Sequence, residues 1–239
     1  MRTVLALVIA AVVAAALAGA FLWKRGDVPG VAAAPPGVTM STPMGQSKDP
    51  KDPGEKMFRN GLYPEALAYW EKEAAKGNAQ AAHRLGEEYL DGKPGVAQRD
   101  LDKAFKYHTQ AAMAGNALSM FDLGSMHEFG QGTARNIAEA ARWYGHSARY
   151  GLAQGQYNYA TMLERGEGIA ADEVEAYKFF VLAARGGFTG IPYDSQHFRV
   201  DSKAPTPAEE MQRRLTAAQV AEGRARADAF KAQTGPLAI

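Results

Sequence analysis

The stretch that decides the fold is LGEEYLDGKPGVAQRDLDKAFKYHTQAAMAGNA, residues 85–117. Its pattern returns twice, as LGSMHEFGQGTARNIAEAARWYGHSARYGLA at residues 123–153 and as LERGEGIAADEVEAYKFFVLAARGG at residues 163–187. In each stretch, two glycines close together separate alanine-rich segments with helical spacing of their apolar residues. Self-similarity at a period of 20–50 residues indicates a solenoid or a related repeat array.

Glycines at positions 77, 115, 151 and 187 set the period, with intervals of 38, 36 and 36 residues. An alanine stands three positions before each of them. Large or aromatic residues stand seven and eight positions before. These are Tyr69, Trp70, Tyr107, His108, Trp143, Tyr144, Phe179 and Phe180. The alanines allow helices to approach closely, and the large residues fill the space between helix pairs.

The residues between these anchors predict where helices end and begin. A second set of glycines suits the left-handed residue that ends a helix: Gly92, Gly130 and Gly166. A polar set follows and suits N-caps of the next helix: Asp100, Asn136 and Asp172. Each unit is therefore predicted to be two antiparallel helices, and units must stack because one alone cannot bury its apolar face.

The three stretches resemble the Sel1-like repeat, a relative of the tetratricopeptide repeat. The resemblance covers residues 63–187, with units at about 63–78 (partial), 79–114, 117–150 and 153–187. The third unit departs from the pattern at Tyr159 and Ala160, where the others have Leu-Gly, and at Gly155, where alanine is usual. The resemblance implies an all-α fold, a right-handed α–α superhelix that binds a partner protein or peptide in its concave groove.

The N-terminus carries an apolar run of twenty residues, Val4 to Trp23, without a charge. A helix of that length would be about 30 Å long, which matches the hydrocarbon core of a bilayer. We predict an uncleaved single-pass anchor over residues 1–25 that contacts the membrane through residues 4–23. The alternative is a signal peptide cleaved near Ala20. The expected location is the inner membrane with a periplasmic repeat domain, or a secreted periplasmic protein after cleavage.

Two further segments flank the repeats. Residues 26–54 are rich in Pro and Gly, which predicts an extended flexible linker. Residues 188–206 contain Gly190, Pro192 and Pro205 and are expected to form a long loop. Residues 207–239 are expected to form one capping helix, to Ala232, and a tail, because a solenoid needs a terminal element that seals its exposed core.

The composition excludes several classes of site. With no cysteine, the chain has no disulfide, thiolate zinc site or cysteine nucleophile. A net charge of +1 argues against a nucleic-acid partner. His108, His127 and His146 are evenly spaced by 19 residues but occupy different repeat phases, so no metal is expected. No catalytic group or cofactor site emerges either, and an enzyme is not expected.

By analogy with tetratricopeptide repeats, the helix after each anchor glycine should line the groove. The residues six, ten and thirteen positions after each anchor glycine should point into the groove. Phe129 is a further candidate, because it is apolar where the other units have Asp91 and Arg165. The candidate partner-binding residues are His83, Glu87, Leu90, Phe121, Ser125, Glu128, Phe129, Tyr157, Thr161 and Glu164. The aromatic residues among them could equally pack between units.

The sequence therefore favours a membrane-tethered scaffold that binds a partner protein in the groove of its repeats. The alternative is an envelope-associated accessory protein that binds peptidoglycan glycan through the groove aromatics. Mixed charge on the repeat surfaces means that specificity must come from local groove residues.

Overall fold

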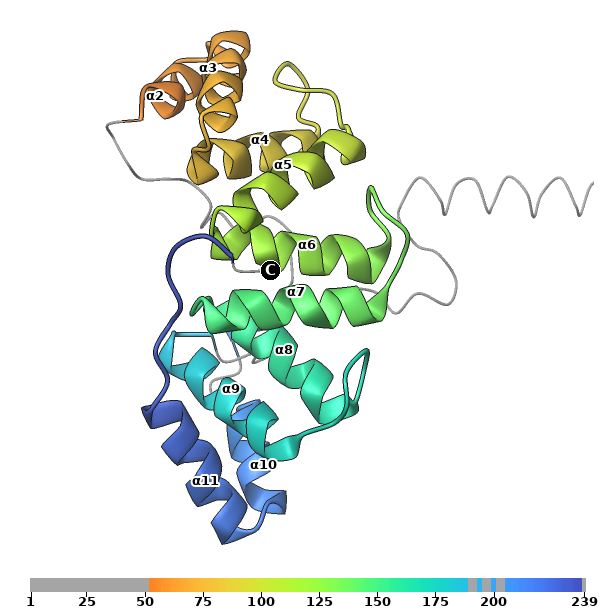
Figure 1. The fold of residues 1–239 in the computed structure, drawn as a ribbon, viewed down its shortest axis with the longest axis vertical. Coiled ribbons are helices and arrows are strands. Elements are labelled where there is room, and N and C mark those ends of the chain that lie inside the picture. Colours follow the sequence, from red (N-terminus) through yellow and green to blue (C-terminus); the bar gives the residue numbers. More distant parts are fainter. Residues whose placement is uncertain (1–51, 189–192, 195–198, 201–204, 238–239) are drawn as a thin grey trace, which may run out of the picture.

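The computed structural model describes residues 52–188, 193–194, 199–200 and 205–237. In this part of the chain, helices stack along one long axis, from α2 and α3 at one end to α10 and α11 at the other (Figure 1). Consecutive helices pack against each other throughout the repeats. The predicted all-α solenoid is confirmed, apart from one short two-stranded ladder outside the repeats.

Six helices of thirteen residues form the three complete units. The first helix of each unit is called its A helix: α4 (Ala79–Asp91), α6 (Ala117–Phe129) and α8 (Ala153–Arg165). The second is its B helix: α5 (Leu101–Met113), α7 (Ile137–Arg149) and α9 (Glu173–Arg185). The units α4–α5, α6–α7 and α8–α9 are the first, second and third repeats.

The predicted helix ends are confirmed. Gly92, Gly130 and Gly166 end the A helices in the left-handed conformation, with φ of 65°, 69° and 69°. The predicted N-caps accept backbone N–H groups of the first turn of each B helix with their side-chain oxygens. They are Asp100, Asn136 and Asp172. Such caps satisfy backbone donors that the helix itself leaves unpaired.

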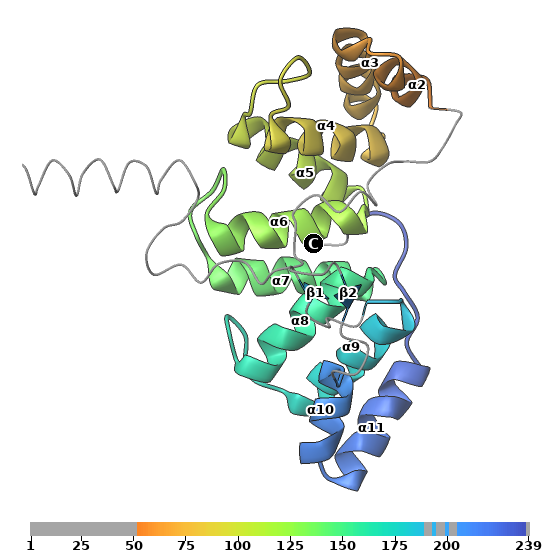
Figure 2. The same cartoon turned by 180° about the vertical axis from the view of Figure 1, so that it is seen from behind.

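The A helices follow one another along one side of the stack, the side nearer the viewer in Figure 2. The middle one, α6, contacts both α4 and α8. We call this side the inner face, because it is the side on which the sequence predicts the groove.

A shorter helix pair precedes the repeats: α2 (Pro53–Arg59) and α3 (Tyr63–Ala75). The predicted linker over residues 26–54 is therefore wrong at its end, because Pro53 and Gly54 belong to α2. Asp52 caps that helix, and proline is favourable in a first helical turn. Gly54 lies against Trp70, and a Cβ there would come 2.2 Å from the indole nitrogen. Residues 26–51 lie outside the described residues.

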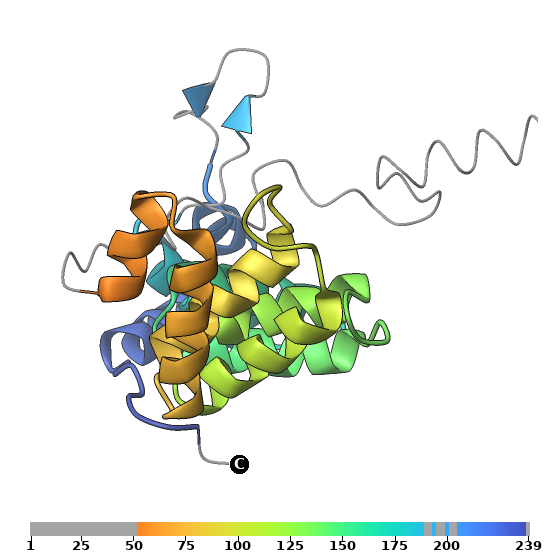
Figure 3. The same ribbon diagram turned by 90° about the horizontal axis from the view of Figure 1, so that it is seen from above.

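The segment after the repeats also differs from the prediction. The expected loop at 188–206 contains a ladder in which β1 (Tyr193–Asp194) pairs antiparallel with β2 (Arg199–Val200). Figure 3 shows the two strands standing apart from the helices. The expected single capping helix is two helices, α10 (Pro207–Arg214) and α11 (Ala217–Asp228). The chain breaks there because Leu215 is extended and buried, and Thr216 forms a capping box with Gln219.

The C-terminal tail then runs back along the stack, past α9 toward α7 and α6 (Figure 1). The Gln233 N–H donates to the carbonyl of Arg149 at 2.9 Å, and the Leu237 N–H donates to that of Met113 at 3.0 Å. Arg149 and Met113 are the last residues of α7 and α5, one repeat apart. The tail thus binds the same turn position in two successive units, which the sequence did not predict.

The predicted membrane anchor, Val4 to Trp23, lies outside the described residues. Among the helices that the structure does describe, none combines the length and the apolar character needed to cross a membrane.

Candidate binding surface and the junctions between repeats

The structure places all ten predicted groove residues on the A helices, but not all on the surface. Three are buried: His83, Leu90 and Ser125. The other seven are partly exposed: Glu87, Phe121, Glu128, Phe129, Tyr157, Thr161 and Glu164. His83 lies inside the stack with 1% of its surface exposed, so a partner in the groove would not contact it in this arrangement.

Two of the predicted groove aromatics pack mainly inside their own units. Phe121 lies 5.5 Å from Tyr144 between ring centres, and Tyr157 lies 5.5 Å from Phe180. Tyr157 also contacts Phe188, at 5.2 Å. In both units an A-helix aromatic meets a B-helix aromatic edge-on or tilted, the geometry that aromatic pairs prefer. These rings contribute to the core of each repeat and leave only part of their surface for a ligand.

The predicted groove carboxylates all have partners within the chain. The Tyr144 hydroxyl donates to Glu128 at 2.7 Å, and Arg84 pairs with Glu87 at 2.8 Å. Arg214 of α10 pairs with Glu164 at 2.5 Å. The last contact brings the C-terminal cap against the A helix of the third unit, so this end of the inner face is partly covered.

Phe129 differs from the other groove aromatics. It is the last residue of α6, is partly exposed, and belongs to none of the core clusters formed by the described residues. It stands where the other units carry Asp91 and Arg165. Phe129 is thus a partly exposed phenylalanine at a position that carries a charged residue in the other two units.

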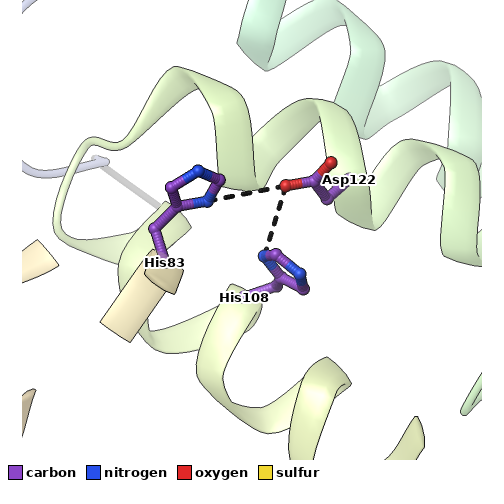
Figure 4. A group of neighbouring side chains, drawn as sticks. All are labelled: His83, His108 and Asp122. Atoms are coloured by element: carbon purple, nitrogen blue, oxygen red, sulfur yellow. Dashed lines mark ion pairs between the residues drawn. The ribbon is translucent and has the colours of Figure 1, made fainter. Parts of the chain in front are cut away.

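The junction between the first and second repeats has a different chemistry. Here His83 of α4 and His108 of α5 occupy the repeat positions of the Phe121–Tyr144 pair, with ring centres 5.7 Å apart. Asp122 of α6 points toward both imidazoles (Figure 4), and the hydroxyl of Ser119 on the same helix lies within hydrogen-bonding distance of both. We call these four residues the first junction. The equivalent positions one repeat later are Phe121, Tyr144, Gly155 and Asn158, the second junction.

The polar atoms of the first junction converge on a small volume. The Nδ1 atoms of His83 and His108 lie 3.0 and 3.3 Å from the Ser119 hydroxyl oxygen. The same two nitrogens lie 3.6 and 3.3 Å from Oδ2 of Asp122. A neighbouring glycine, Gly86, makes room for His108, since a Cβ there would lie 2.7 Å from its ring.

Burial sets the protonation of these groups. It lowers the pKa of His83 to about 4, with a smaller contribution from the charge of Arg84. It lowers the pKa of His108 well below the usual value, with His83 adding to the effect. It also raises the pKa of Asp122 well above its usual range, followed by the charges of Glu87 and Asp91. Without a bound cation, the junction favours neutral side chains.

His83, His108 and Asp122 are the group of described residues whose donor atoms could hold a metal ion, all lying within 4.8 Å of one another. The sequence search missed it because it compared His108 with His127 and His146. The structure separates those two: His127 packs against Phe105, and His146 against Trp143. A comparison of equivalent repeat positions would have shown that the first unit replaces an aromatic pair with two histidines.

Known families and structures agree with this architecture. The Sel1 repeat family matches residues 79–116, 117–149 and 153–188. These three segments of the chain are therefore similar to Sel1 repeats. Proteins with Sel1 repeats generally mediate protein–protein interactions, and their solenoid is a non-catalytic scaffold. The fold is similar to a crystal structure of a Sel1 repeat protein from Oxalobacter formigenes, with 25% identity, a TM-score of 0.53 and 60% of each chain covered.

Two curated relatives match part of this chain. A chitin synthase regulatory factor 1 from Schizosaccharomyces pombe is 38% identical over 74 residues, which are 31% of this chain and 16% of that protein. An ERAD-associated E3 ubiquitin-protein ligase component, HRD3A, from Arabidopsis thaliana is 37% identical over 67 residues, 28% of this chain and 10% of that protein. The chain thus spans only a small part of the length of both relatives.

Proposed function

We propose that the chain is a protein-interaction scaffold that binds a partner protein along the inner face formed by α4, α6 and α8. The observation that carries this proposal is Phe129, a partly exposed aromatic residue at the C-terminal end of α6, the middle one of the three A helices. Partly exposed aromatic side chains surrounded by polar groups are typical anchors of protein interfaces. The partner would supply an apolar side chain that covers Phe129.

Two other side chains of the predicted groove are already held in place. Glu128, the residue before Phe129, accepts the Tyr144 hydroxyl, and the Thr161 hydroxyl of α8 donates to the Tyr157 carbonyl at 3.1 Å. Side chains held in this way lose little freedom when a partner binds. The third unit is partly covered by α10 through Arg214, so the accessible part of the face lies over the first and second units.

The test uses a variant that the repeat itself supplies. Phe129→Asp places the residue of the first unit, Asp91, at the same position of the second. With a photo-crosslinking amino acid placed on the inner face, the wild-type chain in its native membrane should capture one protein in stoichiometric amount. Phe129→Asp should reduce that capture at least about tenfold, because a buried apolar anchor contributes 1.4 kcal/mol or more.

A matched control is Leu62→Asp, because Leu62 is the exposed large apolar residue of the described chain, at 47%, and lies between α2 and α3. It should leave the capture unchanged. Equal capture by wild type and Phe129→Asp, with both proteins equally helical by circular dichroism, would remove the inner face as the binding surface.

We also propose that residues 4–23 tether this scaffold to the inner membrane, with the repeats in the periplasm. The support is the sequence alone, a run of twenty residues without a charge followed by Lys24 and Arg25. A topology reporter fused after Ile239 should be active in the periplasm, and the full-length chain should remain in the membrane fraction after a carbonate wash. A cytoplasmic reporter signal would exclude the proposed orientation, and release by carbonate would indicate cleavage near Ala20.

A further inference from the structure

We propose that the first junction is a metal site, in which His83, His108 and Asp122 bind one divalent transition metal ion of the zinc type. The three side chains come from three helices, α4, α5 and α6, and two successive repeats. Bound metal would therefore link the first unit to the second. Figure 4 shows the two imidazoles turned toward the same carboxylate oxygen.

The distances between the donor atoms fit a tetrahedral ion. Zinc lies about 2.0–2.1 Å from histidine nitrogens and carboxylate oxygens, so two ligands of one tetrahedron are about 3.3–3.4 Å apart. The observed separations from Oδ2 of Asp122 are 3.3 Å to Nδ1 of His108 and 3.6 Å to Nδ1 of His83. These two sides of the triangle therefore need adjustments of at most a few tenths of an ångström, and all three donor atoms lie within 4.8 Å of one another. The Ser119 hydroxyl, 3.0 and 3.3 Å from the two nitrogens, could serve as a fourth ligand.

The hydrogen bonding of the junction is incomplete without an ion. Oδ2 of Asp122 is buried and has no hydrogen-bond partner among the described residues, although two imidazole nitrogens lie near it. A buried carboxylate oxygen without a partner is costly, and a cation satisfies it directly. The outer nitrogen of His83 lies 3.6 Å from Oε1 of Glu87. That is the position of the carboxylate that commonly orients a metal-bound histidine.

The repeat itself provides the comparison that separates a site from ordinary packing. The positions of His83 and His108 are occupied by Phe121 and Tyr144 in the second unit, and by Tyr157 and Phe180 in the third. Only in the first unit, among the three, are both positions histidine, and there the following A helix supplies Asp122. The fold packs well with two aromatic rings, so packing does not require three metal-ligating residues together.

The donor set selects the class of ion. Two imidazoles and one carboxylate suit zinc and its neighbours in the first transition series, whereas Mg²⁺ and Ca²⁺ prefer sites made of oxygen atoms. Asp122 and Glu87 keep 14% and 24% of their side-chain surface exposed, so an ion would enter from the inner face. Metal binding and partner binding would then use the same side of the solenoid.

The experiment measures binding of Co²⁺ and Zn²⁺ to the full chain, purified in detergent without a histidine tag. The wild type should bind one Co²⁺ per chain, with the strong visible absorption of a tetrahedral site, and Zn²⁺ should displace it. Zn²⁺ should also raise the thermal unfolding temperature, because an ion that binds only the folded state stabilises it.

Two variants test the ligands, and one serves as a control. The double variant His83→Phe/His108→Tyr installs the aromatic pair of the second repeat and should abolish the cobalt spectrum. Asp122→Asn, which copies Asn158, should weaken zinc binding at least about tenfold. His146→Gln copies Gln110 of the first unit and should bind like the wild type.

No stoichiometric binding by the wild type would overturn the proposal, as would full binding by the double variant. If the double variant fails to fold by circular dichroism, Asp122→Asn decides: unchanged zinc affinity and an unchanged cobalt spectrum would then exclude this site.

Discussion

The first and second junctions have the same helical frame and opposite chemistry. At the second, Tyr144 is packed against Phe121 and Gly124 and donates its hydroxyl to Glu128, so its polar atom reaches a partner outside the aromatic contact. At the first, the equivalent side chains are imidazoles whose nitrogens meet a carboxylate and a hydroxyl. The two junctions thus share the same backbone arrangement, whereas their side chains differ as a group.

This comparison also separates stability from binding. An aromatic pair stabilises a junction under all conditions, through apolar burial and ring contacts. A polar cluster buried at the same place lowers stability unless each polar atom has a partner. We therefore expect the stability of the first junction to depend on whether a metal ion is bound. The stability of the second junction should not change with metal.

The largest expected effect comes from removing the second junction. Tyr144→Ala should lower the free energy of unfolding by about 3–5 kcal/mol, the usual cost of deleting a buried aromatic side chain. Urea unfolding followed by circular dichroism measures it. Tyr144→Phe keeps the ring and loses the bond to Glu128, so its cost should be about 1 kcal/mol. Equal losses in the two variants would show that the hydroxyl, not the ring, holds the junction.

A smaller effect is expected when the first junction is converted into the second. The variant His83→Phe/His108→Tyr/Ser119→Ala/Asp122→Asn replaces the polar cluster with the residue types of the other units. Ser119→Ala is chosen over glycine because the closest neighbour of a Cβ at Gly155 would be the side chain of Ser147, where the first unit has the smaller Ala111. In the presence of a chelator, we expect this variant to be more stable than the wild type by about 1–3 kcal/mol.

Excess zinc should reverse that order, because it stabilises only the protein that binds it. Urea unfolding with chelator and with zinc gives both values. A converted variant that is less stable than the wild type under chelation would contradict the idea that the polar cluster carries a cost in the metal-free protein.

The smallest effect concerns pH and a histidine outside both junctions. Burial, and then the charges of Arg149 and Arg142, lower the pKa of His146 to about 4. In the unfolded chain His146 titrates near 6.5, so the unfolded state binds the proton first as the pH falls. Its contribution to stability is present above pH 6.5 and is lost progressively between 6.5 and 4.

His146→Gln should remove this part of the pH dependence and leave the rest. The free energy of unfolding, measured at pH 7.5 and 4.5, should change less in the variant than in the wild type. Because Gln110 already occupies the same repeat position in the first unit, the variant should fold normally. An identical pH dependence in both proteins would show that His146 is not held in its neutral form.

Much of the fold followed from local chemistry. The period of the glycines, the polar N-caps and the left-handed C-terminal glycines depend on hydrogen bonds within a few residues of one another, so they can be read along the chain. The same reasoning failed at the two ends. Pro53 and Gly54 look like linker residues, yet one starts α2 and the other packs against Trp70. Leu215 looks like part of a helix, yet it is extended and buried between α10 and α11.

The predicted groove shows the same division. The spacing within the repeat correctly located the residues on the A helices, because position in a helix follows from spacing. Spacing does not show which side chains are packed in the core. Phe121 faces Tyr144, whereas Phe129 is partly exposed and lies outside the core clusters. Whether a side chain on the inner side of a helix is covered depends on the helix packed behind it. That partner lies tens of residues away.

The sequence by itself determined that this protein is a stack of helix pairs similar to Sel1 repeats, since each unit encodes its own helix ends and an apolar face that only another unit can cover. Tertiary structure alone decided two features. It brought Asp122 and Ser119 to His83 and His108 across a boundary between units, and it laid the C-terminal tail on the turns at Arg149 and Met113. Both contacts join residues that are distant in the chain and become neighbours only when the units have stacked.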